Sequence, residues 1–226
     1  MRFNKPNTQL EMLHYIYRNI QLDMGEVIKL LKRKFSKLNQ MIKEEKGVHI
    51  FYNIKEQDTY ICHLIAYIDS ALEQGDHVLL IESQRIINIL RDELKIRLTR
   101  EQMGSLHMIN NFDYYVSTGS FQPEIIFGHL SRTLLPFFDK GISFRIWAHV
   151  EWGQQEGIVA ILEEFEEEAD MVVNEQGLYL VCAYDQSRLP ATLEEKLMKC
   201  HGYVMSENDI VISELYGQPS KSFKKG

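Results

Sequence analysis

The sequence predicts an α/β fold with a mainly parallel sheet and helices on both of its faces, preceded by an N-terminal helical segment. Two observations support this prediction. From Gly47 onward, short apolar runs alternate with longer amphipathic stretches, which is the pattern of β–α–β units. The short runs, such as HVLLI at 77–81, are apolar at nearly every position, as strands covered on both faces are.

Local signals place each element in turn. Apolar runs bounded by turn residues give the strands, which we expect at 49–52, 77–81, 105–109, 142–152 and 178–184. Apolar residues three or four apart give the helices, which we expect at 59–74, 84–98, 123–138, 157–169 and 191–200. Gly75 ends the first helix because glycine suits a left-handed C-cap, and Pro123 opens the third. A closing hairpin is expected at 203–205 and 210–213.

The N-terminal segment is helical by its period. Apolar residues between 8 and 45 are spaced by three and four, with one extra residue near Gly25. Asp23 followed by Glu26 resembles a capping box, which predicts a second helix there. These helices either pack on the domain core or form a dimerising pair or coiled coil. A membrane-surface helix is disfavoured by the acidity of the chain.

We therefore divide the chain into a helical segment at 1–46, an α/β domain at 47–215 and a disordered basic tail at 216–226. The net charge of −7 argues against a general nucleic-acid-binding surface. The three cysteines lack CxxC spacing and no histidine pair has metal-ligand spacing, so we expect no metal, no cofactor and no disulfide framework. Without a signal peptide or a membrane-length apolar run, we expect a cytoplasmic protein with no membrane span.

The loop after the first strand argues against nucleotide hydrolysis. In nucleotide-binding α/β proteins this loop is rich in glycine and ends in Lys-Ser or Lys-Thr, because bare backbone N–H groups must surround the phosphates. Here the loop at 53–58 is NIKEQD, which has no glycine and carries two acids. The layout is typical of a nucleotide-binding architecture, but the loop chemistry is not.

The strand at 142–152 gives the clearest candidate site. Side chains alternate along a strand, so Arg145, Trp147, His149 and Glu151 share one face. Polar groups on a buried strand need partners or water. They either line a pocket near the carboxyl end of the sheet, where such folds bind ligands, or belong to an edge strand or face the N-terminal helices.

Further candidates stand at or near other strand ends. They are Tyr184 and Asp185, His49 and Tyr52, Glu82, and His201. The spacing of His49 and Tyr52 puts them on opposite faces of the first strand. We expect Cys182 and Cys200 to be inert, and the acidic run at 163–168 to form a solvated helix face. No G-x-S-x-G elbow is present, so the case for an enzyme is weak.

Several segments together resemble the MEDS sensory domain family, which occurs in methanogens and methylotrophs and in a dichloromethane-responsive regulator. They are HIFYNIKEQDTYICHLIAYIDSALEQGDHVLLIES, GSLHMINNFDYYVSTGSFQPE, RIWAHVEW, FEEEAD, LVCAYD and His201. The resemblance covers about 47–205 and implies a RecA/KaiC-like fold without a phosphate loop. By position, the residues that match the family pattern are His49, Tyr52, Glu151, Trp152, Tyr184, Asp185 and His201.

The resemblance implies a sensor of small molecules that works with a histidine kinase or a transcription regulator. We expect a non-catalytic sensory or regulatory domain, with aromatic contacts to the ligand from Trp147, Trp152 and Tyr184. Binding would change how the N-terminal helices pair, in a homodimer or with a signalling partner. One alternative is a nucleotide-binding protein or ATPase that holds phosphates with Lys55 and Arg85. Another is a ligand-free interaction module that regulates a kinase.

Overall fold

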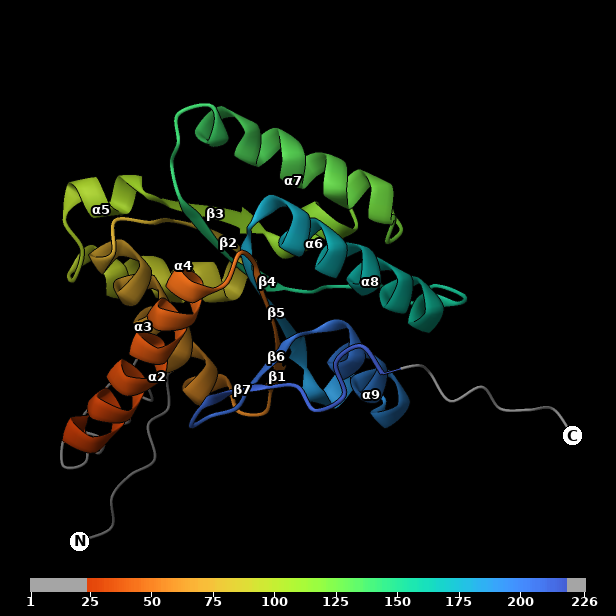
Figure 1. Cartoon of the computed structure of the whole chain (residues 1–226). Helices are drawn as coiled ribbons and strands as arrows, with labels where there is room; N and C mark the ends of the chain where they lie inside the picture. Colours follow the sequence, from red (N-terminus) through yellow and green to blue (C-terminus); the bar gives the residue numbers. More distant parts are fainter. Residues whose placement is uncertain (1–23, 219–226) are drawn as a thin grey trace, which may run out of the picture.

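The structure is a computed structural model that describes residues 24–218 (Figure 1). Its strands are β1 (Val48–Ile54), β2 (His77–Glu82), β3 (Leu106–Asn110), β4 (Phe144–His149), β5 (Tyr179–Asp185), β6 (Tyr203–Met205) and β7 (Ile210–Ile212). Its helices are α2 (Met24–Glu44), α3 (Gln57–Glu73), α4 (Gln84–Lys95), α5 (Arg100–Gly104), α6 (Asn111–Tyr115), α7 (Pro123–Phe138), α8 (Ile158–Gln176) and α9 (Ala191–Cys200), with a 3₁₀ turn, η1, at Gln186–Arg188.

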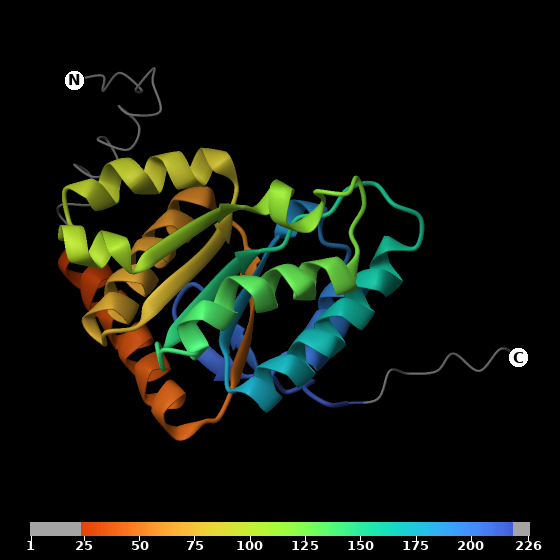
Figure 2. The same ribbon diagram turned by 90° about the horizontal axis from the view of Figure 1, so that it is seen from above.

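The strands form one sheet in the order β3-β2-β4-β5-β1-β6-β7. Every neighbouring pair is parallel except the β6–β7 hairpin. Helices α2, α3 and α4 pack on one face through one apolar cluster, and α6 to α9 pack on the other face through a second cluster (Figure 2). The predicted mainly parallel α/β fold with helices on both faces is therefore confirmed.

The connections diverge at the carboxyl ends of two adjacent strands. The chain leaves β2 toward α4 on one face of the sheet, whereas it leaves β4 toward α8 on the opposite face. The same divergence separates β1, which leads into α3, from β5, which leads into α9. Such points leave a crevice above the strand ends, which is where open α/β sheets bind ligands.

Some boundaries differ from the prediction for local reasons. The helix expected at 84–98 ends at Lys95, and a second short helix, α5, starts after a capping box formed by Thr99 and Gln102. Helix α6 was not predicted; the Asn110 side chain caps its first turn. Helix α8 continues to Gln176, beyond the expected end, and stops before a left-handed glycine.

Helix α2 packs on the domain rather than standing apart. Phe35 and Leu38 are buried in the cluster that includes α3, as the first interpretation of this segment expects. Lys34 is also buried, and its Nζ donates to the Ser206 carbonyl at 2.6 Å, in the turn between β6 and β7. Burial lowers the pKa of Lys34 to about 7.

Parts of the predicted terminal segments lie outside the described residues, namely 1–23 and 219–226. Tyr216, assigned to the predicted tail, is described, and its hydroxyl donates to Asp170 Oδ2 on α8 at 2.8 Å. Within residues 24–218, no helix combines the length and the apolar composition required to cross a membrane.

Gly47 lies where the start of β1 passes the end of α8. A Cβ atom there would lie 2.5 Å from the Val173 carbonyl oxygen. That oxygen accepts bonds from the backbone N–H groups of Gly177 and Leu178, so it cannot move away freely. The close approach therefore requires glycine.

We expect Gly47→Ala to lower the free energy of unfolding by about 1–3 kcal/mol, because overpacking displaces a bonded backbone. Gly104→Ala is the matched control, since a Cβ at Gly104 would meet nothing within 4 Å. The control should stay within about 0.5 kcal/mol of the parent protein. Urea unfolding measures both, and equal effects would contradict the packing argument.

Candidate functional site

A cavity of about 230 Å³ lies at the carboxyl edge of the sheet. Its lining residues come from the ends of β1, β2, β4 and β5 and from the first turns of α3 and α4, and they are Ile54, Lys55, Gln57, Tyr60, Ser83, Arg85, Ile86, His149 and Asp185. We call this cavity the edge pocket. It occupies the crevice where the connections diverge, so topology and cavity indicate the same place.

A buried carboxylate adjoins the edge pocket. Glu82, at the end of β2, is fully buried, and its Oε1 lies 2.8 Å from His149 Nδ1 and accepts from the Ser83 backbone N–H at 2.5 Å. The Tyr60 hydroxyl donates to its other oxygen, and Trp147 Nε1 in turn donates to the Tyr60 hydroxyl at 3.0 Å. These contacts fix the orientation of His149, whose side chain keeps 18% of its surface exposed.

The charges around the edge pocket favour an acidic ligand. Burial alone would lower the pKa of His149, but the hydrogen bond and the charge of Glu82 outweigh it and raise that pKa. Lys55 and Arg85 are exposed, and in the described part of the chain neither forms an ion pair. The first turns of α3 and α4 add backbone N–H groups and the positive ends of two helix dipoles.

The connection between β1 and α3 consists of Lys55 and Glu56 alone. The predicted loop at 53–58 is longer, because β1 continues to Ile54 and α3 begins at Gln57. A phosphate loop needs several residues between its strand and its helix to surround a phosphate with backbone N–H groups. This two-residue connection offers no such loop.

The structure separates the eleven predicted ligand-binding residues into several places. His149 and Asp185 line the edge pocket, and Glu82 lies next to it. Trp147 and Tyr52 are buried in the apolar cluster beneath α3. Arg145 is buried and paired with Asp76 at 2.5 Å, so it does not face the pocket.

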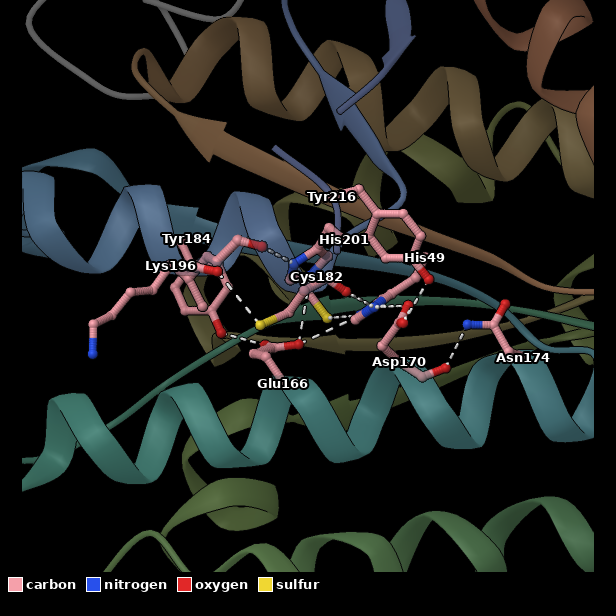
Figure 3. A network of polar contacts seen from close by, with 11 residues as sticks. His49, Glu166, Asp170, Asn174, Cys182, Tyr184, Lys196, His201 and Tyr216 are labelled. Carbon is pink, nitrogen blue, oxygen red and sulfur yellow. Dashed lines mark hydrogen bonds and ion pairs between the residues drawn. The ribbon is translucent and has the colours of Figure 1, made fainter. Parts of the chain in front are cut away.

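The remaining residues lie elsewhere. Strand β4 ends at His149, so Glu151 and Trp152 follow it in a loop, where Glu151 forms an ion pair with Arg188 at 2.6 Å. The Arg188 guanidinium also lies over the Trp152 ring at 4.4 Å. His49, Tyr184 and His201 gather under α8, on the opposite face of the sheet from α3, as Figure 3 shows.

Two further residues of this second group were not chosen as site residues from the sequence. Glu166 was assigned to a solvated acidic face, but it is fully buried, and the Tyr184 hydroxyl donates to its Oε1. The helical period contained the signal, because Glu166 falls on the buried stripe formed by Leu162, Phe165, Ala169 and Val173. Cys182, which was expected to be inert, is buried with its Sγ 3.5 Å from His49 Nε2.

A wider depression of about 410 Å³ is lined by Ile109, Asp113, Tyr114, His129, Arg132 and Thr133, from β3, α6 and α7. It lies beside the edge strand of the sheet, away from the crevice between β2 and β4. None of the predicted site residues lines it. We therefore take the edge pocket as the candidate functional site.

Comparisons with known proteins place this architecture in a family. The model of the MEDS family, described as the methanogen/methylotroph, DcmR sensory domain, matches residues 48–202, which is more than half of the chain. No curated protein matches the chain. Among solved structures, an ATPase domain is similar with a TM-score of 0.48 and 9% identity, over 88% of this chain and 83% of that one.

Removing the charge of Glu82 should lower the pKa of His149. Glu82→Gln leaves a neutral partner, so we expect the pKa of His149 to fall, because a carboxylate favours the charged imidazole. An NMR titration of the His149 ring measures the change. Glu101→Gln, an exposed change on α5, is the control and should leave that pKa in place. An unchanged pKa in Glu82→Gln would show that Glu82 does not raise the pKa of His149.

Proposed function

The chain belongs to the MEDS family of sensory domains, and from this premise we propose that it is a non-catalytic sensor that binds a small acidic molecule in the edge pocket. The observation that carries this proposal is the combination of His149, Lys55 and Arg85 around one cavity at the carboxyl edge of the sheet. Lys55 and Arg85 form no ion pair in the described part of the chain, and such cations beside a partly enclosed cavity favour a ligand with carboxylate or phosphate oxygens.

The size of the edge pocket limits the ligand. Pockets for drug-sized ligands measure roughly 300–1,000 Å³, so about 230 Å³ suits a small metabolite rather than a complete nucleotide. Ile54, Ile86 and the Tyr60 ring supply apolar contact, while Lys55, Arg85 and the His149 ring orient the acidic group. Asp185 also lines the pocket, and its Oδ1 accepts from the Ser187 backbone N–H at 2.9 Å.

The pocket residues support binding better than catalysis. Ser83 is the pocket's serine, and its hydroxyl oxygen is the N-cap of α4, accepting from the Ile86 backbone N–H. The Tyr60 hydroxyl is committed to Glu82, and burial raises the pKa of Tyr60 well above its usual value, with the charge of Glu82 adding to the effect. Neither oxygen is an activated nucleophile.

A chain of contacts leads from the edge pocket to α2. The Tyr60 ring stacks on Tyr52 at 5.9 Å, and the Tyr52 hydroxyl is 2.8 Å from His63 Nδ1. His63 Nε2 is 3.5 Å from Lys34 Nζ, on α2. Ligand contact with Tyr60 would thereby bias the position of α2, which would signal to a second copy of the chain or to a histidine kinase or transcription regulator.

Three free cysteines suit the reducing cytoplasm in which such a sensor would act.

Nucleotide binding is the second candidate function. It is favoured by Lys55 and Arg85 standing at two helix N-termini, an arrangement that can hold phosphates. The two-residue connection after β1 opposes it, because the backbone supplies little of the usual phosphate cradle.

A thermal-shift screen of the purified chain tests these candidates. The panel contains small carboxylates, inorganic phosphate, ATP with magnesium and small apolar metabolites. A ligand that binds only the folded state raises the melting temperature, and we expect this for a small acid. Arg85→Ala should weaken that ligand by about 10–100-fold, because a charged hydrogen bond contributes about 1.5–3 kcal/mol.

Arg91→Ala is the matched control, since Arg91 is an exposed arginine on the same helix. It should leave ligand affinity within about twofold of the parent protein. Magnesium-dependent stabilisation by ATP would favour nucleotide binding instead. No stabilisation by any compound would favour an interaction module that works without a ligand.

A further inference from the structure

Four potential metal ligands meet beneath α8, on the opposite face of the sheet from α3 (Figure 3). They come from β1, α8, β5 and the residue after α9, and they are His49, Glu166, Cys182 and His201. All four are buried, and their ligand atoms lie within 4.8 Å of one another. None of them takes part in the edge pocket.

The distances approach those of a tetrahedral zinc site. Zinc bonds of ordinary length place nitrogen and oxygen ligands about 3.3 Å apart, and nitrogen and sulfur about 3.5 Å apart. His49 Nε2 lies 3.4 Å from Glu166 Oε2 and 3.5 Å from Cys182 Sγ. His201 Nε2 lies 3.5 Å from the same Glu166 oxygen.

Hydrogen bonds turn both imidazoles toward the centre of the cluster. His49 Nδ1 lies 3.2 Å from Asp170 Oδ1 and 3.3 Å from the Cys200 carbonyl, and both of these atoms are acceptors. His201 Nδ1 lies 2.7 Å from the Leu197 carbonyl, also an acceptor. Each Nδ1 therefore carries a proton, and each Nε2 faces the cluster. Metal-bound histidines are held in the same way by carboxylate and carbonyl partners.

Two atoms at the centre of the cluster have no hydrogen-bond partner among the described residues. They are Glu166 Oε2 and His201 Nε2, and both are buried. Buried polar atoms nearly always have a hydrogen-bond partner, so two facing atoms without one need an explanation. His201 Nδ1 bonds to the Leu197 carbonyl, so the lone pair on Nε2 faces the Glu166 oxygen at 3.5 Å. A cation between them satisfies both atoms.

We propose that His49, Glu166, Cys182 and His201 form a structural zinc site. A mixed set of two imidazoles, one thiolate and one carboxylate suits Zn²⁺, which accepts nitrogen, sulfur and oxygen ligands in tetrahedral geometry. With one thiolate and one carboxylate, the dication forms a neutral centre, which suits complete burial. Four protein ligands leave no open position, so the site ties elements together rather than catalysing a reaction.

This site is independent of the edge pocket, because no residue that lines the pocket belongs to the four ligands. A failure of the sensor proposal would leave the zinc site standing, and the reverse also holds.

The full chain, produced with zinc in the medium, should retain about one zinc ion per chain after dialysis, by elemental analysis. Replacement with Co²⁺ should give the visible absorption of tetrahedral cobalt and a thiolate-to-cobalt charge-transfer band. Cys182→Ala should lose the charge-transfer band and most of the metal. Cys62→Ala is the matched control, since that half-buried cysteine lies on α3, across the sheet, and it should keep both.

Wild-type protein without retained zinc or cobalt absorption would overturn the proposal, and this result does not depend on the folding of any variant. Equal loss of metal in the Cys182 and Cys62 variants would also overturn it. In that case the cluster is an ion pair of His49 with its two carboxylate neighbours.

The partner of His49 provides a second test. Asp170→Ala removes the carboxylate that orients the His49 ring, so we expect zinc affinity to fall by about 10–100-fold in a competition with a chromogenic chelator. Glu167→Ala, an exposed carboxylate on the same helix, is the control and should leave the affinity unchanged. Unchanged affinity in the Asp170 variant would exclude His49 as an oriented ligand.

Discussion

The central strands carry ionisable side chains although helices cover both faces of the sheet, and the rest of the structure depends on how these groups are satisfied. An unpaired charge in such a place costs several kcal/mol, so each requires a partner brought from another element. Arg145 on β4 pairs with Asp76, and its Nη1 also donates to Asn39 on α2 at 2.6 Å. The need of the buried Arg145 guanidinium for partners therefore holds α2, which precedes the α/β domain in the chain, against that domain.

The same requirement organises both chemical sites. Glu82 binds the side chains of His149 and Tyr60, which places the His149 ring beside a cavity at the strand ends. Glu166 is surrounded by His49, Tyr184 and His201 on the other face. The first arrangement is satisfied within the protein, and the second leaves two facing atoms unsatisfied among the described residues. This difference explains the two proposed roles. Glu82 orients a residue of the ligand pocket, whereas Glu166 binds a metal.

Periodicity predicted most of the fold, because strands covered on both faces and amphipathic helices have patterns that depend only on nearby residues. Strand ends could also be predicted, which is why Glu82 and Asp185 were chosen from the sequence, whereas His149 was chosen as a polar residue on a buried strand. Arg145 shares a face with His149 but lies at the amino end of β4, and alternation does not reveal its partners, Asp76 and Asn39, which come from elsewhere in the chain.

The buried cluster could not be predicted from spacing, since its members stand at 49, 166, 182 and 201 in the chain. Sequence motifs for metals rely on ligands a few residues apart, whereas this cluster depends on which strands become neighbours. Strands β1 and β5 pair in parallel, with Ile54 opposite Asp185 at the carboxyl end and His49 opposite Leu180 near the amino end. Five residues of strand span about 16 Å, so one strand pair carries the edge pocket at one end and a cluster that holds the two strands to α8 near the other. A metal that held β1 and β5 together would also hold in place the strand ends that line the edge pocket, without contacting the ligand.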